Sequence, residues 1–114
     1  MVAELLTAYI LTFATTSAVL AADKRTSAEG IAADLIPVPV AITSDCGFCL
    51  RIPAGALGLS NEQDGEELVQ MEGLAGPLGA QGLWTERTAV AVESGQKTGL
   101  KRTYKEQKHY EQIF

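Results

Sequence analysis

Both cysteines of the chain lie in one short segment, Cys46-Gly47-Phe48-Cys49, three positions apart. Cysteine can act as a nucleophile, as a soft metal ligand and as a carrier of sulfur. The rest of the sequence has one histidine and one tryptophan, and it contains neither a phosphate-binding glycine loop nor a cluster of acids around a histidine. We therefore expect any chemistry of this protein to involve the segment 42–51.

Cys46 has the sequence context of a reactive thiol. A cysteine that acts as a nucleophile or as a sulfur carrier needs an accessible thiolate. Gly47 leaves one flank of Cys46 unshielded and lets another protein approach. Arg51 would favour the thiolate if it folds back, whereas Asp45 would oppose it. The alternative is that Cys46 packs beneath a loop as a small apolar side chain, and burial is expected even more for Cys49 within a strand.

The Cys-x-x-Cys spacing has three further interpretations. A structural disulfide explains it poorly, because the closed loop would be very small and extended backbone separates the two Cα atoms too far. A thiol–disulfide oxidoreductase would use Cys46 with Cys49 as resolving thiol, but such motifs begin a helix, and Pro53 stops any helix soon after. A zinc site needs four ligands, and His109 is distant and expected to be solvated, so it would require a dimer that pools four thiolates.

The distribution of charge divides the chain. The formal net charge is −5 for 114 residues, which argues against nucleic acid as a partner. Residues 1–96 carry 4 basic and 12 acidic side chains, a net of −8, whereas residues 97–114 carry 5 basic and 2 acidic ones, a net of +3. We therefore predict one domain over residues 7–94 and a peripheral basic C-terminal tail over 95–114, either a short helix or disordered.

Residues 5–22 contain no charged side chain and end in small residues, as a signal peptide would, with cleavage after Ala21 or Ala22. Against this, Glu4 precedes the stretch and no Lys or Arg does. Its threonines also make it too polar to span a bilayer well. We expect a cytoplasmic protein that does not engage a membrane.

The pattern along the chain predicts six elements in the order strand, helix, strand, strand, helix, strand: residues 8–13, 18–29, 31–36, 48–52, 60–72 and 84–93. This order favours an α+β sandwich of the ferredoxin-like kind, in which a four-stranded antiparallel sheet carries two helices on one face. The glycines that recur every third residue over 73–82 predict a flexible loop.

Local signals support the two helices. Thr15, Thr16 and Ser17 are each suitable caps for the first, and Gly30 stands where its C-terminus needs a positive φ. For the second helix, Ser60 or Asn61 is expected to be the cap, and Leu68 and Met71 to face the core. Its acidic side chains are expected to be solvated: Glu62, Asp64, Glu66 and Glu67.

Several stretches, taken in order, resemble a small bacterial family of unknown function described as putative selenium/sulfur carrier-like. They are Tyr9-Ile10-Leu11-Thr12-Phe13, Thr15-Thr16-Ser17-Ala18, Gly30-Ile31, Leu35-Ile36-Pro37-Val38-Pro39 and Ile42-Thr43-Ser44-Asp45-Cys46-Gly47-Phe48-Cys49-Leu50-Arg51. The resemblance covers residues 8–52, and neither the glycine-rich segment nor the basic tail has a counterpart in the family.

The resemblance implies a carrier or adaptor rather than an enzyme. Cys46 would be the carrier thiol, with Gly47 and Arg51 as its motif neighbours. The partners would be a donor enzyme that forms a persulfide or selenide and a downstream acceptor protein, and no bound cofactor is required. The alternatives from other classes are the Cys46–Cys49 oxidoreductase and a binding module whose cysteines do no chemistry.

Overall fold

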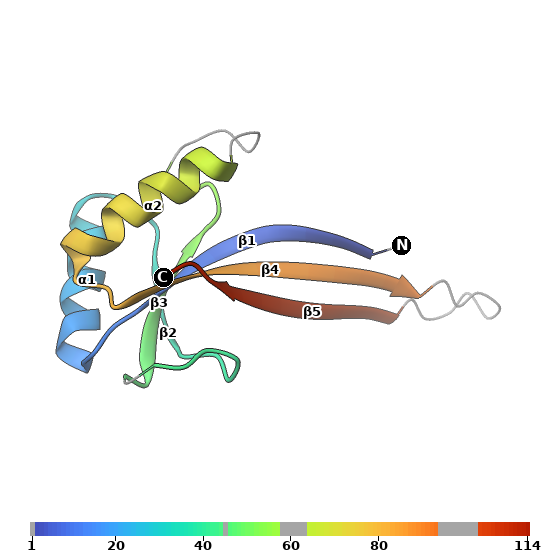
Figure 1. The fold of residues 1–114 in the computed structure, drawn as a ribbon, viewed down its shortest axis with the longest axis horizontal. Coiled ribbons are helices and arrows are strands. Elements are labelled where there is room, and N and C mark those ends of the chain that lie inside the picture. Colours follow the sequence, from blue (N-terminus) through green and yellow to red (C-terminus); the bar gives the residue numbers. More distant parts are fainter. Residues whose placement is uncertain (1, 45, 58–63, 94–102) are drawn as a thin grey trace.

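The computed structural model describes residues 2–44, 46–57, 64–93 and 103–114 of the chain. They form five strands and two helices (Figure 1). In chain order these are β1 Val2–Thr12, α1 Thr16–Ala28, β2 Asp34–Pro37, β3 Phe48–Pro53, α2 Asp64–Leu78, β4 Gly82–Glu93 and β5 Thr103–Gln112. Neither helix is both long and apolar enough to cross a membrane within this described part of the chain.

All strands belong to one antiparallel sheet in the order β2-β3-β1-β4-β5. The first six elements follow the predicted β-α-β-β-α-β order, and the α+β fold is confirmed. The predicted strand count is wrong, because the sheet has five strands instead of four. The fifth strand comes from the segment that was expected to be a peripheral tail.

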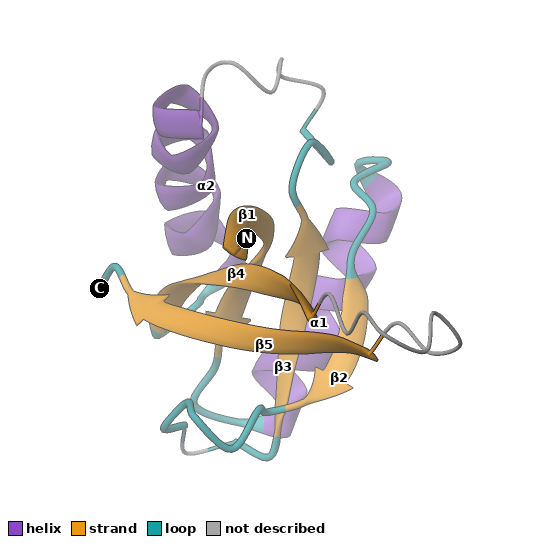
Figure 2. Ribbon diagram, turned by 90° about the vertical axis from the view of Figure 1, so that its right-hand side faces the viewer, coloured by secondary structure: helices purple, strands orange, loops and turns teal. Residues whose placement is uncertain are grey.

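Both helices cover the same face of the sheet. The main core contains apolar side chains of both helices together with those of the strands beneath, among them Val19 of α1, Met71 of α2, Leu11 of β1 and Leu50 of β3. In Figure 2, α1 lies behind β2 and β3. A second, smaller cluster forms on the opposite face around Ile10, with Trp84 packed against it. We call these the helix face and the open face of the sheet.

Helix α1 is built as its sequence predicts. The Thr15 side chain accepts a hydrogen bond from the backbone N–H of Ala18, which makes Thr15 the N-cap. Gly30, just beyond the helix, has a φ of 75°, a conformation that favours glycine. Within the helix, the buried Thr26 satisfies its hydroxyl by donating to the carbonyl of Ala22.

Helix α2 is longer than predicted, and the expected flexible loop over 73–82 is wrong for its first half. The helix continues to Leu78, and Gly79 follows with a φ of 82°. Met71, Ala75 and Leu78 recur at spacings of four and three and are all buried. Burial of this stripe outweighs a glycine penalty of about 1 kcal/mol per interior residue. The expected caps, Ser60 and Asn61, lie outside the described residues.

The predicted solvation of the acidic face of α2 is wrong at Glu67, which is 5% exposed. Its carboxylate accepts a hydrogen bond from the backbone N–H of Gly55 at 2.8 Å and another from the hydroxyl of Tyr9 at 3.1 Å. These bonds satisfy a buried charge and attach α2 to the centre of the sheet.

Strand β5 pairs with β4 from Trp84↔Gln112 to Glu93↔Thr103. The strand was missed because residues 103–112 are charged or polar at most positions, whereas a half-buried strand alternates with apolar ones. A charged side chain on an edge strand, such as that of Lys108 in β5, discourages further pairing. Whether residues 7–94 fold without it stays a prediction.

Three strands continue beyond the helices and give the protein an elongated shape (Figure 1). The radius of gyration is 16.1 Å, against about 13 Å expected for a compact chain of this length. Within this region, β1 has a bulge at Thr7, between the paired residues Leu6 and Ala8. The Thr7 hydroxyl donates to the carbonyl of Glu86 at 3.1 Å. The extra residue lets both Leu6 and Tyr9 face the helices.

Candidate functional site

Cys46 lies just before β3 and packs on the helix face. It is 5% exposed and belongs to the same core cluster as Leu50 and Ile52. Because side chains alternate along a strand, a residue two positions before Phe48 continues the face of Leu50 and Ile52. The predicted carrier thiol is therefore a buried group at the end of the sheet, near the beginning of α1.

The sulfur of Cys46 accepts one hydrogen bond and lies close to a hydroxyl that can donate or accept. The backbone N–H of Phe48 donates to Cys46 Sγ at 3.5 Å, and Thr16 Oγ1 lies 3.8 Å from the same atom. The backbone N–H of Cys46 donates to Ser44 Oγ at 3.3 Å, which fixes the start of the turn. Sulfur is a weak acceptor when neutral, so an N–H together with a donating hydroxyl suits it best when it carries negative charge.

The hydroxyl near the sulfur belongs to the first turn of α1. Thr16 is the first residue of the helix, and no acidic side chain lies in its first turn. The positive end of the helix dipole is therefore not neutralised from within the helix, and it favours negative charge on a nearby atom. Sequence reasoning sought a helix after the cysteines, whereas this one precedes Cys46 in the chain. The run Thr15-Thr16-Ser17 was the available signal, and it was interpreted only as a cap.

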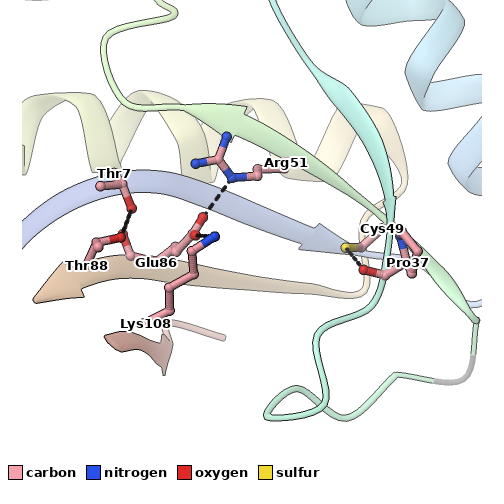
Figure 3. A network of polar contacts seen from close by, with 7 residues as sticks. All are labelled: Thr7, Pro37, Cys49, Arg51, Glu86, Thr88 and Lys108. Atoms are coloured by element: carbon pink, nitrogen blue, oxygen red, sulfur yellow. Dashed lines mark hydrogen bonds and ion pairs between the residues drawn. The ribbon is translucent and has the colours of Figure 1, made fainter. Parts of the chain in front are cut away.

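Cys49 lies on the other face of the sheet. It is fully buried and packs with Ile10 and Ile42 in the open-face cluster. Burial raises the pKa of the Cys49 thiol to about 11, with smaller contributions from Cys46 and Glu86. The thiol points toward the carbonyl oxygen of Pro37, 4.0 Å away (Figure 3). Cys49 is thus a neutral thiol at physiological pH, which makes it a poor nucleophile.

Arg51 also lies on the open face, two residues after Cys49. Its Nε donates to Glu86 Oε2 at 2.8 Å, and Lys108 Nζ lies 3.2 Å from Glu86 Oε1 (Figure 3). The guanidinium is therefore committed to Glu86 and does not fold back toward Cys46. Glu86 is 1% exposed, so this carboxylate between two cations is a buried network that the sequence did not indicate.

Gly47 lies between Cys46, which packs on the helix face, and Phe48, the first residue of β3. A methyl group built on its Cα would meet no other atom within 4 Å. Phe48, which follows, is 43% exposed. The space beside Gly47 is consequently open, whereas Cys46 itself is buried.

The two cysteines are both free thiols, and their side chains belong to clusters on opposite faces of the sheet. A disulfide between them would require the turn at Gly47 and the start of β3 to rearrange. Within the described ranges, no group of three or more His, Cys, Asp or Glu side chains gathers where it could hold a metal ion. His109 is exposed, and Trp84 packs partly buried on the open face.

Comparison with known proteins places the chain in one family. No curated protein and no solved structure shows significant similarity to the chain. The family described as "Putative Se/S carrier protein-like" matches residues 8–74, which include β1, α1, β2, β3, both cysteines and most of α2. This match covers more than half of the 114 residues. The chain belongs to the Se/S carrier protein-like family.

Proposed function

We propose that this protein carries sulfur or selenium on Cys46 and passes it between partner proteins, without itself catalysing a further reaction. The observation that carries the proposal is the setting of Cys46 Sγ, which lies beside the N–H of Phe48 and the hydroxyl of Thr16 at the N-terminal end of α1. Thiolates, persulfides and selenides bound to cysteine are all anionic or readily become so. Two donors and a helix N-terminus stabilise such charge.

The transfer step needs no cofactor and no external oxidant. The Cys46 thiolate attacks the terminal sulfur of a donor persulfide, and a new S–S bond forms to Cys46 Sγ. The S–S bond of the donor breaks, and the donor's own sulfur leaves with the electron pair and takes up a proton. Delivery to an acceptor thiol is the same exchange in the opposite sense. For selenium, an S–Se bond takes the place of the S–S bond.

The mechanism requires that a partner protein reach the buried sulfur of Cys46. With 5% of Cys46 exposed, a partner reaches the sulfur only when the side chains packed around it move aside. Next to Cys46, a Cβ atom at Gly47 would meet no atom within 4 Å apart from its chain neighbours, so another backbone has room to approach there. The burial of Cys46 also favours the competing hypothesis, in which the protein is a binding module and Cys46 is a packing residue.

The proposed partners are a donor enzyme that forms a persulfide or selenide and an acceptor protein. We place this exchange in the cytoplasm. Cleavage after Ala21 or Ala22 would remove β1, which lies at the centre of the sheet, and half of α1. The mass of the protein purified from a bacterium tests this proposal: an N-terminus at Ala22 or Asp23 would overturn it.

The function is tested by incubating the protein with glutathione persulfide and measuring intact masses of the wild type, Cys46→Ser and Cys49→Ser. A carrier gains one sulfur in the wild type and in Cys49→Ser, and gains none in Cys46→Ser. An oxidoreductase would instead lose two hydrogen atoms, and both cysteines would be required. If the wild type takes up no sulfur and its thiols resist alkylation while the protein is folded, the carrier function is refuted and Cys46 is a packing residue.

A further inference from the structure

Thr15 and Thr16, at the start of α1, have different roles. Thr15 is the N-cap, because its hydroxyl oxygen accepts the N–H of Ala18 at 3.1 Å. Thr16 is the first helical residue, and its hydroxyl lies beside Cys46 Sγ. Since Thr15 already provides the side-chain cap, helix capping does not explain the hydroxyl at position 16.

We propose that Thr16 is the positioning residue of the carrier thiol: its hydroxyl donates to Cys46 Sγ and orients the sulfur for attack. The inference deepens the proposed carrier function and rests on it for its biological meaning. The contact joins atoms 30 residues apart in the chain, so the fold and not the local motif brings them together.

The hydrogen-bond roles at the sulfur are set by its charge. A hydroxyl can donate or accept, whereas the backbone N–H of Phe48 can only donate to Sγ. A thiolate has no proton to give, so Thr16 must then be the donor as well. The two donors come from different elements, Thr16 from α1 and Phe48 from β3. Together they restrict the rotation of the Cys46 side chain and hold the sulfur in one orientation.

The next residue supplies a matched control. Ser17 is in the same first turn, is exposed, and also carries a hydroxyl. Thr16→Val and Ser17→Val both replace a hydroxyl residue of that turn with valine, with a closely similar cost in helix propensity. Thr16→Val also keeps the branched shape of the side chain. Thr16→Ser keeps the hydroxyl and loses the methyl group.

The experiment measures the rate at which iodoacetamide alkylates Cys46 in the folded full-length protein, for the wild type and the three variants. Peptide fragmentation locates the label on Cys46 or Cys49, and thermal melts show that each variant is folded. We expect Thr16→Val to slow alkylation of Cys46 by roughly fivefold, the size expected for one hydrogen bond. Thr16→Ser should restore most of the rate, and Ser17→Val should match the wild type.

The inference would be overturned by equal rates in Thr16→Val and the wild type, by equal slowing in Ser17→Val, by no rescue in Thr16→Ser, or by no reaction of Cys46 in any folded protein. A faster reaction in Thr16→Val would also overturn it, since the hydroxyl would then only restrict the access of reagents to the sulfur. Uptake of sulfur from glutathione persulfide is scored separately. A wild type that takes up no sulfur but shows the expected alkylation pattern would refute the carrier function and leave the role of Thr16 standing.

Discussion

Arg51 Nε of β3 donates to Glu86 Oε2 of β4 at 2.8 Å, although β1 lies between these two strands in the sheet. On β1, Ile10 is the register partner of Arg51 and Ala8 is that of Glu86, so the bond runs diagonally across β1. Lys108 of β5 approaches the other oxygen of the same carboxylate. A residue of the cysteine motif thus links β3, β4 and β5 on the face opposite Cys46. Its position argues for a structural role for Arg51 instead of one in activating the thiol.

Replacing Glu86 with glutamine should destabilise the protein by about 2 kcal/mol. The change removes the charge between two cations and leaves the guanidinium of Arg51 without its partner. The loss is smaller than for a fully buried pair, because the side chains of Arg51 and Lys108 are 27% and 47% exposed. Urea unfolding measures the effect, and Glu111→Gln, an exposed position on β5, is the matched control. Equal urea midpoints for Glu86→Gln and Glu111→Gln would contradict the structural role of the contact between Arg51 and Glu86.

Cys49 should make the stability of the protein depend on alkaline pH. The pKa of its thiol is raised from 9.0 to about 11 in the folded state, so folding favours the protonated form. The contribution of Cys49 to the free energy of unfolding is fully present at pH values below 9, where the thiol is protonated in both the folded and the unfolded state. It is lost as the pH rises toward 11, because the thiol of the unfolded state releases its proton first. The loss is on the order of 2 to 3 kcal/mol.

The measurement is the free energy of unfolding of the wild type and Cys49→Ala at pH 8 and at pH 11. Tyr110 also has a raised pKa, chiefly because of burial. Since Tyr110 is present in both proteins, its contribution cancels to first order in the comparison. A fall of the same size in both proteins would show that the Cys49 thiol does not titrate as the structure indicates.

The two cysteines should resist pairing with one another. Their side chains lie on opposite faces of the sheet, so an oxidant such as diamide should not produce an intramolecular disulfide in the folded protein. The same treatment in urea, where the chain is free to turn, serves as the positive control. Rapid loss of two hydrogen atoms under native conditions would revive the oxidoreductase hypothesis.

Gly47→Val should separate transfer from a protein donor from transfer from a small molecule. Position 47 has space for a side chain, and its φ is not in the left-handed region. We therefore expect the free energy of unfolding to change by less than about 1 kcal/mol. Uptake from glutathione persulfide should be nearly unchanged, whereas uptake from a persulfide-forming enzyme should fall severalfold, because the valine obstructs approach of its backbone. An equal effect on both donors would mean that Gly47 serves the turn alone.

Removing residues 97–114 tests the boundary that the charge pattern predicted near Gly95. We expect a protein that still melts cooperatively but is less stable by on the order of 2 to 4 kcal/mol, since the truncation removes Lys108 from Glu86 and Ile113 from the core. Circular dichroism with thermal and urea melts measures both properties. Loss of cooperative folding would show that β5 is part of the minimal domain.

The local sequence was enough to identify the elements that carry strong signals. The apolar, β-branched run at residues 8–13, the Thr15 cap and Gly30 each act within a few residues, and α1 forms where its signals lie. Strand β1 includes most of the predicted run but begins at Val2, six residues earlier than predicted. The cysteine segment also preceded a short strand as predicted. The α+β class followed from the order of such elements, because few arrangements bury the apolar faces of that order.

Tertiary contacts decided the features that the sequence did not reveal. The glycines at 73 and 76 are helical because Met71, Ala75 and Leu78 are buried against the sheet, and β5 exists because the edge of β4 offers a partner. The same is true of the site. The sequence determined that the two thiols would lie next to one another in the chain, but strand alternation placed them on opposite faces. Only the packing of α1 against the end of β3 brought the hydroxyl of Thr16 to Cys46, since contacts between residues distant in sequence depend on how whole elements pack.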